Sequence, residues 1–316
     1  MGKFINPFTD IGFKRIFGQE FSKPLLIDFL NNLLHGERNI TNVKLLDKEL
    51  TAEFQEGRTI IYDVYCETET GEKIIVEMQN RLQSNFKART HYYAAEAIAR
   101  QGEKGKDWNY DVKAVYLVAF INDHDSSFGL QFRTDVELTD RQTKQPFTDL
   151  LRLVYLQLPL FNKEAEECEN DFERWIYVLK NMETLNRLPW AAQSAVFKRL
   201  AEISDLSSLT REEREHYDSA IRTYRDNIYT MEGEREKGRA EGRAEGRAEG
   251  RAEGRAEGKA EGRAEGREEA RKEYISLLEK SQNELAQMKK VAEAEKSRAD
   301  MLEKEVARMK EKSKAL

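Results

Sequence analysis

The 316-residue sequence contains little cysteine, little histidine and no long apolar run, and these shortages exclude several classes of protein. Two cysteines, Cys66 and Cys168, cannot build a disulfide framework or a thiolate metal site. The four histidines show no metal-ligand spacing such as HExxH. The longest apolar run, residues 114–121, is far shorter than the roughly 20 residues of a membrane helix, and the first ten residues have no signal-peptide core. We therefore expect a soluble, cytoplasmic protein with no membrane partner.

The composition divides the chain into a globular part and a charged part. Residues 1–230 carry all the tryptophans and all the prolines. We expect a core in 1–125, with further strands and a helical subdomain of the same globular unit in 126–230. A repeat, mostly Arg-Ala-Glu-Gly, occupies 231–267, and a Lys/Glu/Ala-rich segment without glycine or proline forms the tail, 268–316.

The repeat predicts a weak helix, because each glycine costs about 0.8–1 kcal/mol relative to alanine and a period of four stacks like charges at i,i+4. It is either a solvated spacer or a stripe of small residues that lets another helix approach. The tail carries a heptad pattern, which predicts either a coiled coil that makes a homo-oligomer or a solitary helix. Its a and d positions are Tyr274, Leu278, Leu285, Met288, Ala292, Ala299, Leu302, Val306, Met309 and Leu316.

The chemistry is concentrated in a predicted hairpin, RTIIYDVYCET followed by EKIIVEMQN. A three-residue loop with Gly71 in the left-handed position places Asp63 directly opposite Glu77. We expect Tyr62, Val64, Cys66, Ile74, Val76 and Met78 on the core face, and Asp63, Glu77 and Gln79 on the other. Opposed carboxylates repel, so this pair predicts a cation between them.

Mg²⁺, or another hard divalent cation, suits two carboxylates together with the backbone carbonyl of Met78. Such an ion could activate water and neutralise charge on a phosphate. The alternative is an exposed acidic pair of the kind that hairpins often carry, and a one-residue slip in register would separate the two carboxylates.

The remaining pattern predicts a mixed sheet flanked by helices, α/β in class. We expect helices from Asp10, capped by Thr9, to Gly18, from Pro24 to Gly36 and over 82–101, with a strand buried on both faces at 111–121. From Asn80 to Lys106 the chain has an excess of basic residues, which is typical either of a surface that follows a phosphate backbone or of a solvated helix face.

These residues resemble the PD-(D/E)XK nuclease family transposases, also called the Rpn family of recombination-promoting nucleases. The resemblance covers about residues 3–230. It begins with NPFTDIGFKRIFG at 6–18 and DFLNNLL at 28–34, and continues with Asp63, the Gly71 turn and VEMQ at 76–79. Arg89 with the Tyr92/Tyr93 pair, LVYLQLPLF at 153–161 and FERWIYVLKNM at 172–182 complete it.

The resemblance implies a restriction-endonuclease-like core in 1–125, αβββαβ in order, and Mg²⁺-dependent DNA cleavage in the bacterial cytoplasm. Asp63 and Glu77 would hold the metal, and Gln79 stands where the superfamily usually has lysine, so its position lacks a positive charge. Lys14 could supply that charge or could be a surface lysine. Arg89 and Tyr93, one helical turn apart, could flank DNA or brace their helix.

Two classes of function follow from the sequence. The first is a DNA endonuclease, associated with recombination or mobile elements, whose catalytic residues are Asp63, Glu77, Gln79 and Lys14. The second is a catalytically weak DNA-binding or oligomeric module organised by its tail. Metal-dependent cleavage of RNA is also compatible with the same residues.

Overall fold

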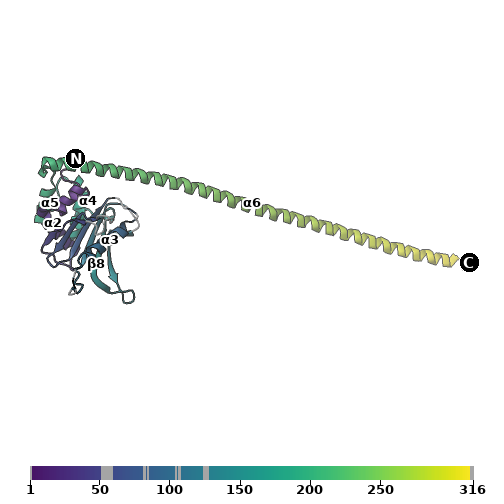
Figure 1. Cartoon of the computed structure of the whole chain (residues 1–316). Coiled ribbons are helices and arrows are strands. Elements are labelled where there is room, and N and C mark those ends of the chain that lie inside the picture. The colour runs from purple at the N-terminus through teal and green to yellow at the C-terminus, as the bar shows by residue number, and fades with distance from the viewer. Residues whose placement is uncertain are drawn as a thin grey trace. The chain divides into compact units, whose positions relative to one another are not determined.

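The structure is a computed structural model that describes residues 2–50, 60–80, 83, 85–103, 105, 108–123 and 128–313. The chain divides into two compact units, residues 1–230 and 231–316. Figure 1 shows the order of the elements along the chain. The helices are α1 (Asp10–Phe17), α2 (Lys23–Leu33), α3 (Phe86–Ala99), α4 (Asp171–Asn181), α5 (Ala195–Ser204) and α6 (Arg211–Ser313). The strands are β1 (Val43–Leu45), β2 (Glu49–Leu50), β3 (Ile60–Ile61), β4 (Val64–Thr68), β5 (Lys73–Gln79), β6 (Val115–Ile121), β7 (Arg133–Thr139) and β8 (Pro146–Gln157).

A six-stranded mixed sheet organises the first unit, in the order β1-β4-β5-β6-β8-β7. The β4–β5 hairpin is antiparallel, whereas β5, β6 and β8 run parallel to one another. A separate two-stranded sheet pairs β2 with β3. Apart from the short β2–β3 pair, the elements from α2 onward are α2, β1, β4, β5, α3 and β6. This is the expected αβββαβ order, so the unit fits an α/β restriction-endonuclease-like fold.

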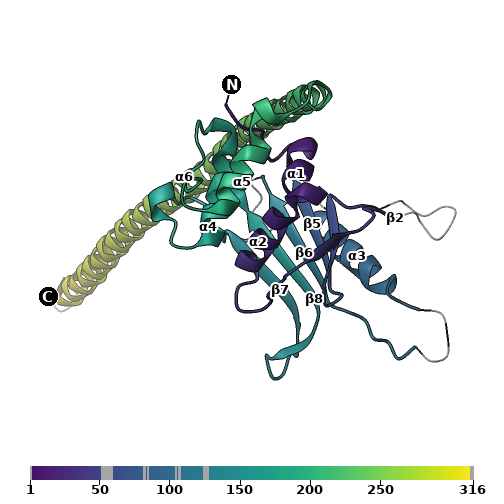
Figure 2. The ribbon, with the colours of Figure 1, turned by 90° about the vertical axis from the view of Figure 1, so that its left-hand side faces the viewer.

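Helices cover both faces of the sheet (Figure 2). Helices α1, α2, α4 and α5 pack on one face together with Val64 and Val76 of the hairpin. Helix α3 covers the other face, where Ile75 and the strand β6 supply the apolar side chains. All seven residues of β6 are buried, as a strand with helices on both faces requires. The sequence predicted one core face for the hairpin, whereas the structure has two.

Tyr62 is the residue for which strand alternation gave the wrong face. We expected it beside Val64, but it packs with Tyr65 and α3 on the opposite face, and its hydroxyl donates to the Tyr93 carbonyl at 3.0 Å. The chain bends at Asp63, which lies outside β4, and this bend interrupts the alternation of side chains.

Local signals place α1 as the sequence predicts. The Thr9 hydroxyl accepts a hydrogen bond from the Gly12 N–H at 3.0 Å, which satisfies one of the unpaired donors at the helix start. The helix ends at Phe17, and Gly18 is its C-cap, as expected. Residues 51–59, between β2 and β3, lie outside the described residues, as does Leu82 at the expected start of α3.

Helix α6 runs without interruption through the Arg-Ala-Glu-Gly repeat (Figure 1). Its first turns are anchored in the globular core by Tyr217 and Ile221. The segment after the repeat is rich in strong helix formers. A weak helical segment between two stable ones avoids the cost of nucleation, which explains why the repeat is helical despite its glycines.

Candidate active site

The β4–β5 hairpin brings Asp63 and Glu77 together. Val64 pairs with Val76, and the Thr68 N–H donates to the Glu72 carbonyl at 2.9 Å across the loop, so the predicted register is confirmed. Gly71 has the left-handed φ of +93° that the predicted loop requires. Just beyond the last strand pair, the Asp63 N–H donates to Glu77 Oε1 at 3.3 Å. The two carboxylates therefore belong to one cluster.

Both carboxyl groups lie in a poorly solvated place. The Glu77 side chain is buried, and Asp63 is half-buried. Burial, followed by the negative charge of Asp63, raises the pKa of Glu77 to about 8. Burial also raises the pKa of Asp63, against the hydrogen bond from the Met78 N–H, at 2.7 Å to Oδ2, and the positive charge of Lys14. The pair is costly to ionise without a cation nearby.

The backbone of β5 adds a carbonyl oxygen, that of Met78, on the side of the strand where Asp63 lies. The Gln79 carbonyl accepts from the Asn122 N–H at 2.9 Å, so residue 79 turns its backbone groups toward β6. Neighbouring residues of a strand alternate in this respect, and the Met78 carbonyl therefore points toward the side on which Asp63 lies. Two carboxylates and this carbonyl form an all-oxygen donor set that fits a hard divalent cation retaining several waters.

Lys14 brings a positive charge to this cluster from α1. Its ammonium forms an ion pair with Asp10, one helical turn earlier. Burial lowers the pKa of Lys14, but the hydrogen bond and the charge of Asp10, with a contribution from Asp63, raise it overall. Lys14 therefore lies within electrostatic reach of Asp63, and its ion pair is with Asp10.

Two charged groups at the site escaped the sequence analysis. Asp10 served there only as the start of α1, although its spacing of four from Lys14 could have indicated the ion pair. Lys48 lies beside the residues that lead into the hairpin, because its backbone carbonyl accepts a hydrogen bond from the Tyr62 N–H at 2.9 Å. Burial and then the positive charge of Lys14 lower the pKa of Lys48. No local pattern pointed to Lys48, because it reaches the site through the β2–β3 pairing.

Arg89, on α3, contacts the site through Gln79. Its guanidinium donates to Gln79 Oε1, and also to Gln83 Oε1 at 3.4 Å. The guanidinium lies over the rings of Phe86, at 5.1 Å, and Tyr93, at 5.9 Å. We expected Arg89 either to flank DNA or to brace its helix. The structure links it to one of the predicted catalytic residues.

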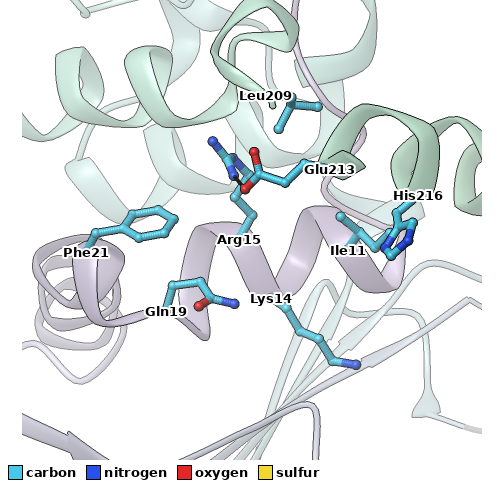
Figure 3. Close-up of a pocket in the computed structure, with 8 residues that line it drawn as sticks. All are labelled: Ile11, Lys14, Arg15, Gln19, Phe21, Leu209, Glu213 and His216. Atoms are coloured by element: carbon cyan, nitrogen blue, oxygen red, sulfur yellow. Dashed lines mark hydrogen bonds and ion pairs between the residues drawn. The ribbon is translucent and has the colours of Figure 1, made fainter. Parts of the chain in front are cut away.

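A pocket of about 260 Å³ lies beside α1, and Leu209, Glu213 and His216 line it from the facing segment (Figure 3). Arg15 crosses it, paired with Glu213 at 2.6 Å, and its Nε donates to the Ile203 carbonyl at 2.9 Å. Lys14 also lines the pocket, but in Figure 3 its ammonium points away from Arg15 and Glu213. Arg15 therefore ties α1 to α5 and α6.

The described residues limit what can hold a metal or cross a membrane. Among them, no three or more His, Cys, Asp or Glu side chains gather into a metal-binding group, so the candidate centre consists of two carboxylates supplemented by backbone oxygen. No described helix is both long and apolar enough to span a membrane. Of the basic residues in 80–106, Arg81, Lys104 and Lys106 lie outside the described residues, and Arg100 pairs with Glu96 at 2.8 Å.

Comparison with known proteins supplies the family. The family model described as PD-(D/E)XK nuclease family transposase matches residues 7–234, which include α1, the hairpin and α3. No curated protein and no solved structure gives a significant match.

Proposed function

The chain belongs to the PD-(D/E)XK nuclease family transposases, and from this premise we propose that it is a Mg²⁺-dependent DNA endonuclease acting in recombination or in the movement of mobile elements. The observation that carries the proposal is the pairing of the half-buried Asp63 with the buried Glu77. Burying two like charges side by side destabilises a protein, and a protein that only binds DNA gains nothing from it. A divalent cation would offset the cost.

The residues of the pair have distinct roles in this proposal. Asp63 and Glu77, with the Met78 carbonyl, hold the cation, and the Met78 N–H keeps Asp63 oriented. When bound, Mg²⁺ supplies charge neutralisation at the phosphate and a more acidic water. Gln79 donates a hydrogen bond to the reacting group, and Lys14 adds positive charge beside Asp63. Water adds to phosphorus, the P–O bond to the leaving oxygen breaks, and a proton from the water ends on that oxygen.

The other parts of the chain have supporting roles. We assign the nuclease core to 1–125, extended by the strands and helices of 126–230, and a spacer to 231–267. The tail, 268–316, would form a homo-oligomer, because apolar side chains such as Leu278, Leu285 and Val306 are between 42% and 55% exposed along its heptad positions. DNA is the proposed partner, and the bacterial cytoplasm the proposed location.

Nicking of supercoiled plasmid tests the proposal. Asp63→Asn and Glu77→Gln keep the hydrogen-bond acceptors but remove the charges, and Glu67→Gln alters a glutamate of the same hairpin that pairs with Lys73 at 2.5 Å. We expect Mg²⁺-dependent nicking by the wild type and by Glu67→Gln, and a loss of roughly 100-fold or more in the other two variants.

Three results would contradict the proposal. Equal cleavage by the wild type and Asp63→Asn would place the activity elsewhere or in a contaminant. A folded wild type that binds DNA without cleaving it would favour the binding module. Faster cleavage of RNA than of DNA would overturn the assignment of the substrate.

A further inference from the structure

We propose that Arg89 is a positioning residue that acts through Gln79, and that the Arg89–Gln79 pair replaces the lysine that the superfamily usually carries at position 79. The inference rests on the proposed function and deepens it. Its basis is the hydrogen bond from the Arg89 guanidinium to Gln79 Oε1, which joins α3 to the end of β5.

The chemistry of arginine fixes the orientation of the glutamine amide. A guanidinium has only donors, so the Gln79 oxygen must face it, and the amide nitrogen must point elsewhere. Without Arg89 the amide could present either its oxygen or its nitrogen to a substrate. With Arg89 in place, Gln79 offers a donor, and a cation bonded to the amide oxygen strengthens that donor. A donor is what a phosphate oxygen requires.

The surroundings of Arg89 hold it in this position. Phe86 and Tyr93 lie three residues before it and four after it, on the same face of α3, and their rings lie against the guanidinium. Arg89 Nε is buried and has no hydrogen-bond partner among the described residues. An arginine that merely braced its helix could avoid this unsatisfied donor by turning outward, whereas a functional site can retain it.

Arg89 also places its positive charge near both predicted metal ligands. Its positive charge acts on both Asp63 and Glu77, whereas Lys14 acts on Asp63. A lysine at position 79 would deliver its charge from β5 itself. Here the charge comes from the neighbouring helix, and Gln79 connects it to the site.

A rescue experiment tests the replacement. Arg89→Met should slow plasmid nicking at saturating Mg²⁺ and DNA by roughly tenfold or more, with an almost unchanged Kd for DNA measured in Ca²⁺. Gln79→Lys with Arg89→Met should recover most of the rate, because lysine then supplies the charge directly. Arg89→Lys should stay impaired, because one ammonium cannot reproduce the geometry of the guanidinium. Arg100→Met, on the same helix, should behave as the wild type.

A second measurement does not depend on cleavage. At about pH 9, removal of a nearby cation should tighten Mg²⁺ binding in Arg89→Met by roughly 3- to 10-fold by calorimetry, because the positive charge of Arg89 opposes a second cation. The double variant should return toward the wild-type affinity, and Arg100→Met should not change it.

Several results would overturn the inference. Failure of Gln79→Lys to rescue Arg89→Met, a loss confined to DNA affinity and its salt dependence, or equal Mg²⁺ affinity in all variants would each refute it. If Arg89→Met does not fold, Arg89→Lys still decides, because cleavage by this variant at the wild-type rate would refute the role of the guanidinium. Absence of cleavage by the wild type would refute the proposed function instead, and the Mg²⁺ affinities would still test the Arg89–Gln79 pair.

Discussion

Removing the charge of Glu77 should change how the stability of the metal-free protein depends on pH. Folding raises the pKa of Glu77 from its ordinary value of 4.5 to about 8. Between these values the folded state binds more protons than the unfolded state, so the free energy of unfolding falls as the pH rises. The stabilising contribution is fully present below about pH 4.5 and is lost as the pH rises through 8.

The size of the effect follows from the shift. One pKa unit corresponds to 1.36 kcal/mol, so ionisation of Glu77 should lower the free energy of unfolding by about 3 kcal/mol between pH 5 and pH 8. Glu77→Gln keeps an oxygen that can accept from the Asp63 N–H and has no charge to lose. We expect this variant to match the wild type at pH 5 and to be about 3 kcal/mol more stable at pH 8.

Urea unfolding in EDTA, followed by tryptophan fluorescence at a series of pH values, measures this difference. Every tryptophan lies in the globular unit, and the fully buried Trp175 reports on its core and not on the long helix. Glu67→Gln, on the same hairpin, serves as the control and should keep the wild-type dependence on pH. Parallel curves for the wild type and Glu77→Gln, or a Gln variant less stable at pH 8, would refute the argument from burial.

Three further predictions concern the metal, the turn and the tail. Mg²⁺ at 100 times its Kd should stabilise the wild type by about 2.7 kcal/mol, and Asp63→Asn should lose most of this gain in a thermal-shift series. Gly71→Ala should lower the free energy of unfolding in urea by roughly 1–2 kcal/mol, because φ is +93° and the new Cβ would lie 3.2 Å from Lys113 Cγ. An unchanged midpoint would mean that the turn relaxes freely. Leu285→Lys should lower the mass of the assembly that the full-length protein forms, measured by sedimentation, whereas Val291→Lys, outside the a and d positions, should not. A monomeric wild type would rule out the oligomer.

The hairpin was predictable because local rules determine it. A glycine at position 71 selects the loop, the loop fixes the register, and the register places Asp63 beside Glu77. The sequence also indicated a mixed sheet and the burial of β6 on both faces. These inferences needed only neighbouring residues and the period of the strand.

The rest of the site depends on how distant segments pack, which no local rule specifies. The bend at Asp63 turns Tyr62 toward α3, so the second core face was missed. The contact of Arg89 with Gln79 requires α3 to dock on the sheet, and Lys48 reaches the cluster through a separate strand pair. The sequence therefore identified the acidic half of the candidate site and Lys14 as a candidate source of positive charge, while the link of Arg89 to Gln79 and the position of Lys48 required the structure.

The helical repeat illustrates how helix geometry bears on two interpretations of a sequence. In an α-helix with 3.6 residues per turn, a period of four turns each glycine by about 40° relative to the one before. The glycines from Gly238 to Gly266 are thus spread over about 280° of the helix and form no straight seam for a partner helix. The helix therefore favours the spacer, in which each added repeat lengthens the connection by about 6 Å and leaves no fixed face to maintain.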